Sequence, residues 1–145
     1  MHIQDFHAAK ILIIDDEPEK IELLSGLLKL FKYENTVGTT DGHSAALMFA
    51  QVRPDLVILD LHLRECSGFD VLREIAPLVG PDEYVPILVL TADSSQQSRE
   101  KALLNGAMDF VAKPFNSAEI ILRVRNLLHT RLLYLRLSAQ LGLAS

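Results

Sequence analysis

Three aspartates follow apolar runs of the sequence at positions where their carboxylates could bind a metal ion. Asp15 and Asp16 come directly after residues 11–14, and Asp60 comes directly after residues 56–59. If folding brings these side chains close together, their negative charges repel one another and require a cation. Mg²⁺ binds carboxylate oxygens and keeps part of its water shell. The three aspartates therefore predict a Mg²⁺ site.

Two further polar residues end apolar runs later in the chain. Thr91 follows residues 86–90, and Lys113 comes shortly after residues 108–111. The lysine adds a positive charge that offsets the carboxylates. Taken singly, the aspartates and the threonine could be helix caps or turn residues, and the lysine could be a solvated charge. Because all of them end successive apolar runs, the sequence favours one shared site.

The apolar runs themselves predict the strands of a parallel sheet. Residues 11–14, 56–59 and 86–90 are unbroken apolar stretches, as expected of strands covered on both faces. Residues 35–38 and 108–111 predict two weaker strands. Helical patterns separate the strands, at about residues 18–31, from 41 to before 54, 68–78 and 94–105. The last of these should be loosely held, because only Ala102, Leu103 and Leu104 can pack.

This alternation of strands and helices predicts the fold class. It indicates an α/β domain with a flavodoxin-like five-stranded parallel sheet, strand order 2-1-3-4-5, and helices on both faces. In that order the first, third, fourth and fifth strands are neighbours. The aspartates, Thr91 and Lys113 can therefore converge at the carboxyl edge of the sheet.

Composition restricts the possible partners. The 145 residues are enough for one domain, and 49% of them are hydrophobic. The formal net charge is −5, and because residues 116–145 carry four arginines against one glutamate, the first 115 residues carry −8. This acidic body does not favour nucleic acid as a direct ligand.

Other classes of protein are also disfavoured. The single cysteine, Cys66, excludes an intrachain disulfide, and the five histidines have no metal-ligand spacing. No apolar run approaches the length of a membrane span, and the first residues have no signal-peptide pattern. We therefore expect a cytoplasmic protein without a membrane partner.

Four segments of the sequence carry a resemblance to a known family. They are residues 11–17 (Ile-Leu-Ile-Ile-Asp-Asp-Glu), 55–60 (Asp-Leu-Val-Ile-Leu-Asp) with Gly68 further on, 90–92 (Leu-Thr-Ala), and 106–115 (Gly-Ala-Met-Asp-Phe-Val-Ala-Lys-Pro-Phe). In this order and spacing they resemble the receiver domain of two-component response regulators. The resemblance covers about residues 9–128, and residues 129–145 form a C-terminal helical extension.

The resemblance implies a chemical role for Asp60 and its neighbours. Asp60 would be the phosphoacceptor, attacking the phosphoryl group of a phosphohistidine on a histidine kinase or histidine phosphotransfer protein. Asp16, Asp60 and the backbone carbonyl of His62 would bind Mg²⁺, with Asp15 nearby or bound through water. Mg²⁺ and Lys113 would neutralise the transferring group.

The resemblance also implies a conformational switch. Thr91 would hydrogen-bond the new phosphoryl group and draw its loop inward, and the small Ala92 would leave room for that group. Phe110 occupies the aromatic switch position and would pack inward when Thr91 moves. The Lys113–Pro114 peptide bond would be cis, which aims the lysine. The chain would change conformation and oligomeric state to control an output, and it would catalyse only its own phosphorylation and dephosphorylation.

Three positions depart from the family pattern. The loop after Asp60 carries Leu63-Arg64 in place of the usual methionine–proline pair, which bears on loop rigidity. His62 replaces a small or amide residue, which bears on water access and dephosphorylation. Phe110 has no hydroxyl, so its outward rotamer would lack a hydrogen bond. None of these departures removes a required group.

Two other functions fit parts of the pattern. Phosphatases of the haloacid dehalogenase type also use an aspartate at a strand end with Mg²⁺, but they need a second aspartate two residues later, where this chain has His62. A pseudo-receiver that has lost phosphorylation would not be expected to keep the complete set of charged residues and Thr91. Both alternatives are therefore less favoured than a phosphorylated receiver.

The C-terminal segment predicts one long helix from residue 116 to about residue 141. At about 1.5 Å per residue it would be about 39 Å long. Ile121, Leu128 and Leu135 lie seven residues apart, so the helix either folds back on its own domain or pairs in a homodimer and leads to an output domain outside these residues. Residues 122–128 resemble, on weaker evidence, the linker of regulators with an HD-GYP-type cyclic-dinucleotide output domain.

Overall fold

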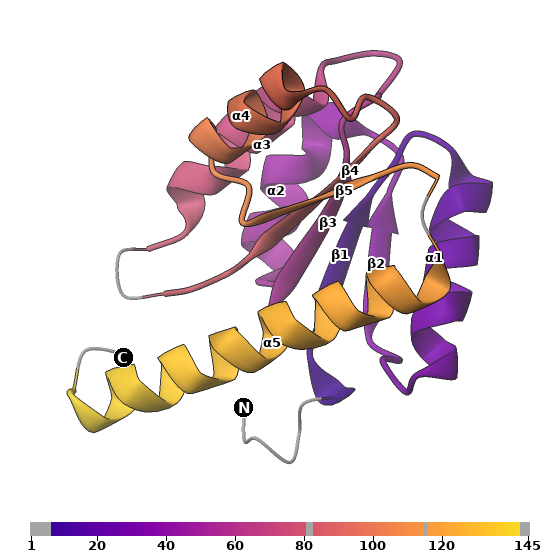
Figure 1. Cartoon of the computed structure of the whole chain (residues 1–145). Coiled ribbons are helices and arrows are strands. Elements are labelled where there is room, and N and C mark those ends of the chain that lie inside the picture. Colours follow the sequence, from indigo (N-terminus) through magenta and orange to yellow (C-terminus); the bar gives the residue numbers. More distant parts are fainter. Residues whose placement is uncertain (1–6, 81–82, 115, 143–145) are drawn as a thin grey trace.

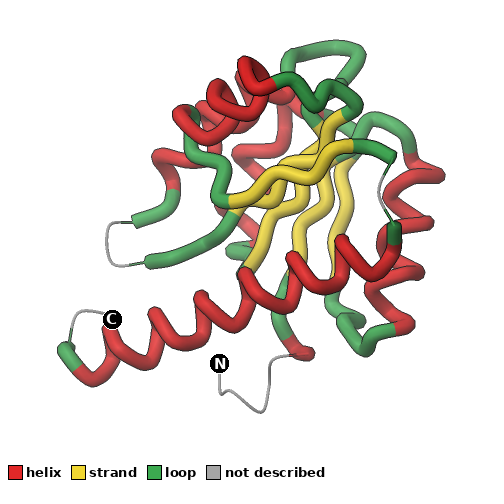
Figure 2. The backbone as a smooth tube through the Cα atoms, in the orientation of Figure 1, coloured by secondary structure: helices red, strands yellow, loops and turns green. Residues whose placement is uncertain are grey.

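The chain folds around one parallel sheet. The computed structural model describes residues 7–80, 83–114 and 116–142. Within these residues the strands are β1 (Ile11–Ile14), β2 (Thr36–Thr39), β3 (Leu56–Asp60), β4 (Ile87–Thr91) and β5 (Asp109–Ala112). All neighbouring pairs are parallel, and the order is β2-β1-β3-β4-β5 (Figure 2). The predicted fold class and strand order are confirmed.

Helices cover both faces of the sheet (Figure 1). On one face lie α1 (Pro18–Leu30) and α5 (Ser117–Gln140). On the other face lie α2 (Ala45–Val52), α3 (Gly68–Ile75) and α4 (Gln96–Leu104). Two short 3₁₀ turns, η2 (Gly42–Ser44) and η3 (Ala76–Leu78), adjoin α2 and α3.

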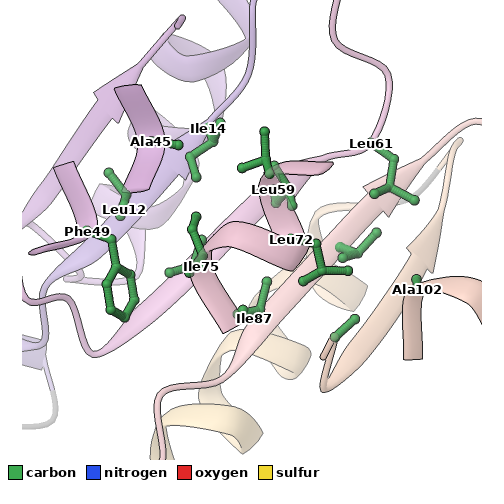
Figure 3. Packing of buried hydrophobic residues seen from close by; sticks show 14 of the residues in the cluster. Leu12, Ile14, Ala45, Phe49, Leu59, Leu61, Leu72, Ile75, Ile87 and Ala102 are labelled. Carbon is green, nitrogen blue, oxygen red and sulfur yellow. The ribbon is translucent and has the colours of Figure 1, made fainter. Parts of the chain in front are cut away.

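The two faces of the sheet have separate cores. Leu12 and Ile14 of β1 pack with residues of α2 and α3, whereas Ile11 and Ile13 of the same strand pack toward α1 and α5. Figure 3 shows the first of these cores, with Leu72 of α3 among the strand residues. Because both sides of each central strand are buried, the strands are continuously apolar rather than alternating.

Two expectations about the helices were wrong in detail. The predicted helix 68–78 ends as an α-helix at Ile75, because Pro77 lacks an N–H, and η3 follows it. In α4, Ala102 is buried as expected, but Leu103 is 46% exposed and Leu104 is 87% exposed. This helix therefore packs through fewer residues than predicted.

The long C-terminal helix packs along its own domain with one face. Leu132 is buried, and Tyr134 lies against Tyr84 with ring centroids 5.9 Å apart. Arg131 Nε donates to Asp55 Oδ1 at 2.9 Å, and another guanidinium nitrogen donates to the Tyr84 carbonyl at 2.7 Å. Residues 131, 132 and 134 of this single continuous helix thus contact the domain, while pairing of the helix in a homodimer stays a prediction.

The opposite face of α5 still carries exposed leucines. Leu122, Leu133 and Leu137 are each at least half exposed.

In the described part of the chain, no helix combines the length and apolarity that a bilayer crossing requires.

Candidate functional site

The carboxyl edge of the sheet gathers the charged residues that the sequence predicted. Asp60 is the last residue of β3, Thr91 is the last residue of β4, and Lys113 directly follows β5. Lys113 Nζ donates to Asp60 Oδ2 at 2.9 Å, and the Lys113 backbone N–H donates to the Thr91 carbonyl at 2.7 Å. The Lys113–Pro114 bond is cis, as expected. Three neighbouring strands thus build one site.

Asp60 is a buried carboxylate with both oxygens engaged. Its side chain is 3% exposed, and the His62 backbone N–H donates to Oδ1 at 2.8 Å while Lys113 occupies Oδ2. A buried charge is tolerated when it is paired and hydrogen-bonded in this way. The following loop returns close to the strand end, where a side chain at Gly68 would collide with the backbone of Leu61.

A cluster of carboxylates lies beside Asp60. Carboxylate oxygens of Asp15, Asp16 and Glu17 all lie within 4.8 Å of one another. Asp60 is not a member of this compact group among the described residues, although the sequence predicted that it would gather with Asp15 and Asp16. Sequence reasoning also missed Glu17, whose only signal was its place next to the two aspartates.

The electrostatics of the cluster favour a cation. Burial, opposed by the Glu17 backbone N–H bond and reinforced by the charge of Asp60, raises the pKa of Asp15 to about 6. An oxygen-only donor set with this much negative charge is of the kind that Mg²⁺ binds. The chemistry of the residues therefore fits an acidic metal pocket. That the His62 carbonyl serves as a ligand stays a prediction.

Arg64 contributes positive charge to the same cluster. Its backbone N–H donates to Asp16 Oδ2 at 2.9 Å, its Nε lies 3.5 Å from that oxygen, and its guanidinium reaches Glu17 at 3.9 Å. The sequence had marked Arg64 only as a departure in loop composition. Its contact with the acidic residues required the fold, because the two loops are 48 residues apart.

Thr91 makes its side-chain hydrogen bonds away from Asp60. The residue is fully buried, and its Oγ1 accepts from the Asp93 backbone N–H at 3.0 Å and lies 3.0 Å from His62 Nε2. Asp93 in turn accepts from Ser98 Oγ and from the Ser95 backbone N–H, and these bonds lower the pKa of Asp93. The β4–α4 loop is therefore tied to the start of α4.

Phe110 already packs inward. It is 5% exposed in the core with Ala102 and Ala107, and the Arg99 guanidinium lies 5.5 Å from the centre of its ring. This packing coexists with the Thr91–His62 contact, so in this structure it does not depend on a bond from Thr91 to Asp60. The switch role of Phe110 stays a prediction.

One protein family and several known regulatory proteins match this chain in sequence. Residues 11–125 match the response regulator receiver domain family. A probable transcriptional regulatory protein, TcrX of Mycobacterium tuberculosis, is 36% identical over 128 residues, which is 88% of this chain and 53% of TcrX. The DNA-binding response regulator MtrA of Mycolicibacterium smegmatis is 38% identical over 116 residues, covering 80% of this chain and 49% of MtrA. The chain thus spans about half the length of these curated relatives.

Solved structures agree with the sequence matches. The receiver domain of a putative LuxO repressor protein from Vibrio parahaemolyticus superposes with a TM-score of 0.77 at 27% identity, covering 86% of this chain and 93% of that domain. The BeF₃-activated receiver domain of RstA from Klebsiella pneumoniae gives a TM-score of 0.72 at 29% identity, covering 82% and 97% respectively. Both superpositions cover more than four fifths of this chain.

Proposed function

The chain belongs to the response regulator receiver domain family, and from this premise we propose that Asp60 accepts a phosphoryl group from a phosphohistidine. The donor is a histidine kinase or a histidine phosphotransfer protein. The observation that carries the proposal is the buried Asp60 carboxylate at the end of β3, with Lys113 Nζ 2.9 Å from Oδ2 and an acidic cluster beside it.

The transfer exchanges one bond to phosphorus for another. An Asp60 carboxylate oxygen attacks the phosphorus, an O–P bond forms, and the N–P bond to the donor histidine breaks. The electron pair of that bond returns to the imidazole nitrogen. Lys113 offsets the negative charge on the transferring oxygens, and a carboxylate is a competent nucleophile for such a covalent step.

The metal is proposed to be Mg²⁺. Asp15, Asp16 and Asp60 would hold it together with the His62 carbonyl, and when bound it would supply further positive charge to the phosphoryl oxygens. The raised pKa of Asp15 supports a cation here, because burial and the nearby charge of Asp60 make its ionised form costly unless positive charge is added. Thr91 would then bond the phosphoryl group, with Phe110 as its aromatic partner in the switch.

The phosphorylated chain is proposed to act on an output and not on an external substrate. The named relatives are described as transcriptional or DNA-binding regulators and are about twice as long as the matched region. This favours an output that acts on DNA over the HD-GYP type. The receiver itself is acidic, so we do not assign it a direct nucleic-acid contact. A kinase partner would suit a cytoplasmic location, which is part of the proposal.

A homodimer through the outward face of α5 is part of the proposal. Leu122, Leu133 and Leu137 remain exposed although the inward face of the helix is packed. Light scattering of the whole chain should show a dimer, at least after phosphorylation, that L133E/L137E abolishes. Because the inward face is part of the core, this double substitution is a better test than truncation. A wild-type chain that stays monomeric in both states would overturn the dimer.

Phosphorylation is tested by intact mass after incubation with acetyl phosphate. Wild type with Mg²⁺ should gain the mass of one phosphoryl group, and D60N should not. D70N is the matched control, because Asp70 is an exposed aspartate paired with Arg73 away from the site, and it should be phosphorylated normally. EDTA should prevent the gain. A wild-type mass that stays unshifted would overturn the proposed function.

A further inference from the structure

The contact between His62 and Thr91 joins the two loops that border Asp60. The His62 ring nitrogen Nε2 lies 3.0 Å from Thr91 Oγ1, while the His62 backbone N–H donates to Asp60 Oδ1 at 2.8 Å. One residue therefore touches the proposed phosphoacceptor through its backbone and the proposed switch residue through its ring. The transfer chemistry described above makes no use of that ring.

Most of the hydrogen-bonding positions of the Thr91 hydroxyl are already occupied. A hydroxyl donates one hydrogen bond and accepts two. The Asp93 N–H already donates to Oγ1 at 3.0 Å, and the His62 ring occupies a second position. Thr91 is fully buried while the His62 ring lies against its hydroxyl. When Nε2 accepts, it takes up the one hydroxyl proton that Thr91 could give to a phosphoryl oxygen. When Nε2 donates, the contact still keeps Oγ1 beside the imidazole ring.

The surroundings of the two side chains allow the hydrogen bond between His62 and Thr91 to break. His62 is exposed, so its ring can turn into solvent, whereas Thr91 is enclosed. Movement of Thr91 would be passed on through Asp93, which is bonded to Ser95 and Ser98 at the start of α4. Phe110 is already inside the core, so in this structure the polar bond is the contact that holds Thr91 in place.

We propose that His62 is a positioning residue that holds the Thr91 hydroxyl in the unphosphorylated arrangement and competes with the phosphoryl group for it. This inference rests on the proposed function of Asp60. Its consequence is that activation must break one hydrogen bond before Thr91 can bond the phosphoryl oxygens. Removing the ring makes the activated arrangement easier to reach.

Binding of beryllofluoride measures this competition without hydrolysis of an acyl phosphate. Beryllofluoride with Mg²⁺ is titrated into wild type, H62A, T91A and the H62A/T91A double variant, and ¹⁹F NMR gives the affinity. H62A should bind about two- to tenfold more tightly than wild type, the range of one net hydrogen bond. In the T91A background the H62A substitution should change nothing, because the partner is gone.

Two controls separate the ring contact from general effects. H43A removes another exposed histidine, on η2, and should bind like wild type. H62Q keeps a side-chain hydrogen-bonding group and should lie between wild type and H62A. A purely structural role for His62 would not make its effect depend on Thr91.

The possible outcomes are distinguishable. Tighter binding by H62A only when Thr91 is present supports the inference. Unchanged or weaker binding by H62A, or an equal gain in the T91A background, overturns it while leaving Asp60 as the phosphoacceptor. Failure of wild type to bind beryllofluoride and to be phosphorylated would instead overturn the proposed function.

Discussion

Two aspartates flank the same strand and have nearly the same local bonding, yet only one lies in the candidate functional site. Asp55 precedes β3 and Asp60 ends it. Asp55 accepts from Arg131 Nε at 2.9 Å and from the Lys10 backbone N–H at 2.8 Å. Asp60 likewise accepts from one basic side chain and one backbone N–H, at 2.9 and 2.8 Å.

The two ends of β3 differ in the charged groups that surround each aspartate and its direct hydrogen-bond partners. Around Asp60 there are further carboxylates, and burial together with the charge of Asp60 raises the pKa of Asp15. At Asp55 the guanidinium also bonds the Tyr84 carbonyl, which fixes the helix to the body of the domain. Burial and pairing alone therefore do not mark a functional aspartate. What distinguishes the Asp60 end of the strand is the group of carboxylates beside it.

The largest expected effect is on phosphorylation, which should require Asp60 and not Asp55. D60N should lose phosphoryl uptake from acetyl phosphate completely, because the amide is not a nucleophile of this kind. D55N should still be phosphorylated, since it lies at the opposite end of β3. Intact mass of both variants measures this. Loss of phosphorylation in D55N that remains folded by circular dichroism would contradict the comparison.

The next effect concerns stability at the Asp55 end. R131A should lower the free energy of unfolding by about 3 kcal/mol, because it leaves a largely buried carboxylate without its charge partner. R123A, on the same helix, removes a pair with Asp109 whose arginine side chain is 42% exposed, and should cost less than about 1 kcal/mol. Urea denaturation measures both. Equal losses would show that the Asp55 pair is no more than a surface contact.

At the Asp60 end, stability should depend on pH through Asp15. The pKa of Asp15 is raised to about 6 from an ordinary 3.8, so its folded form holds the proton more tightly. Its contribution therefore favours folding below about pH 4 and is lost as pH rises through about 6. Without Mg²⁺, D15N should be more stable than wild type by about 3 kcal/mol at pH 7, the value of a pKa shift of this size.

The pH dependence of that difference is the decisive measurement. The advantage of D15N should shrink toward zero between pH 6 and pH 4, because Asp15 becomes neutral in the wild type. Saturating Mg²⁺ at pH 7 should reduce it as well, since a bound cation stabilises the ionised form. Denaturation curves across this pH range give the result. A difference that does not vary with pH would mean that folding does not raise the pKa of Asp15.

The smallest expected effect belongs to Arg64. Its side chain is 79% exposed, so its attraction to Asp16 and Glu17 is screened by water. R64A should lower the Mg²⁺ concentration needed for half-maximal phosphorylation by about two- to fivefold, the range of an exposed pair. R73A, which removes another exposed arginine, should have no effect. A higher Mg²⁺ requirement in R64A would show that the arginine assists the metal.

Prediction from sequence succeeded where a signal is local. Continuous apolar runs gave the central strands because both faces of each are covered, and Lys113-Pro114 was expected to be cis from its resemblance to the family. It failed where packing decides. Leu104 is apolar and in a helix, yet it is 87% exposed, since α4 touches the sheet through a narrow contact.

The sequence by itself determined the parallel α/β fold and the kinds of residue at each strand end. The signals for these features, the spacing of apolar residues and the turn residues, each lie within a few positions of the chain. Only the tertiary structure decided which of these side chains meet. Arg131 reaches Asp55 across 76 residues and His62 reaches Thr91 across 29. Contacts of this kind depend on the orientation of separate elements in space, which local patterns along the chain do not encode.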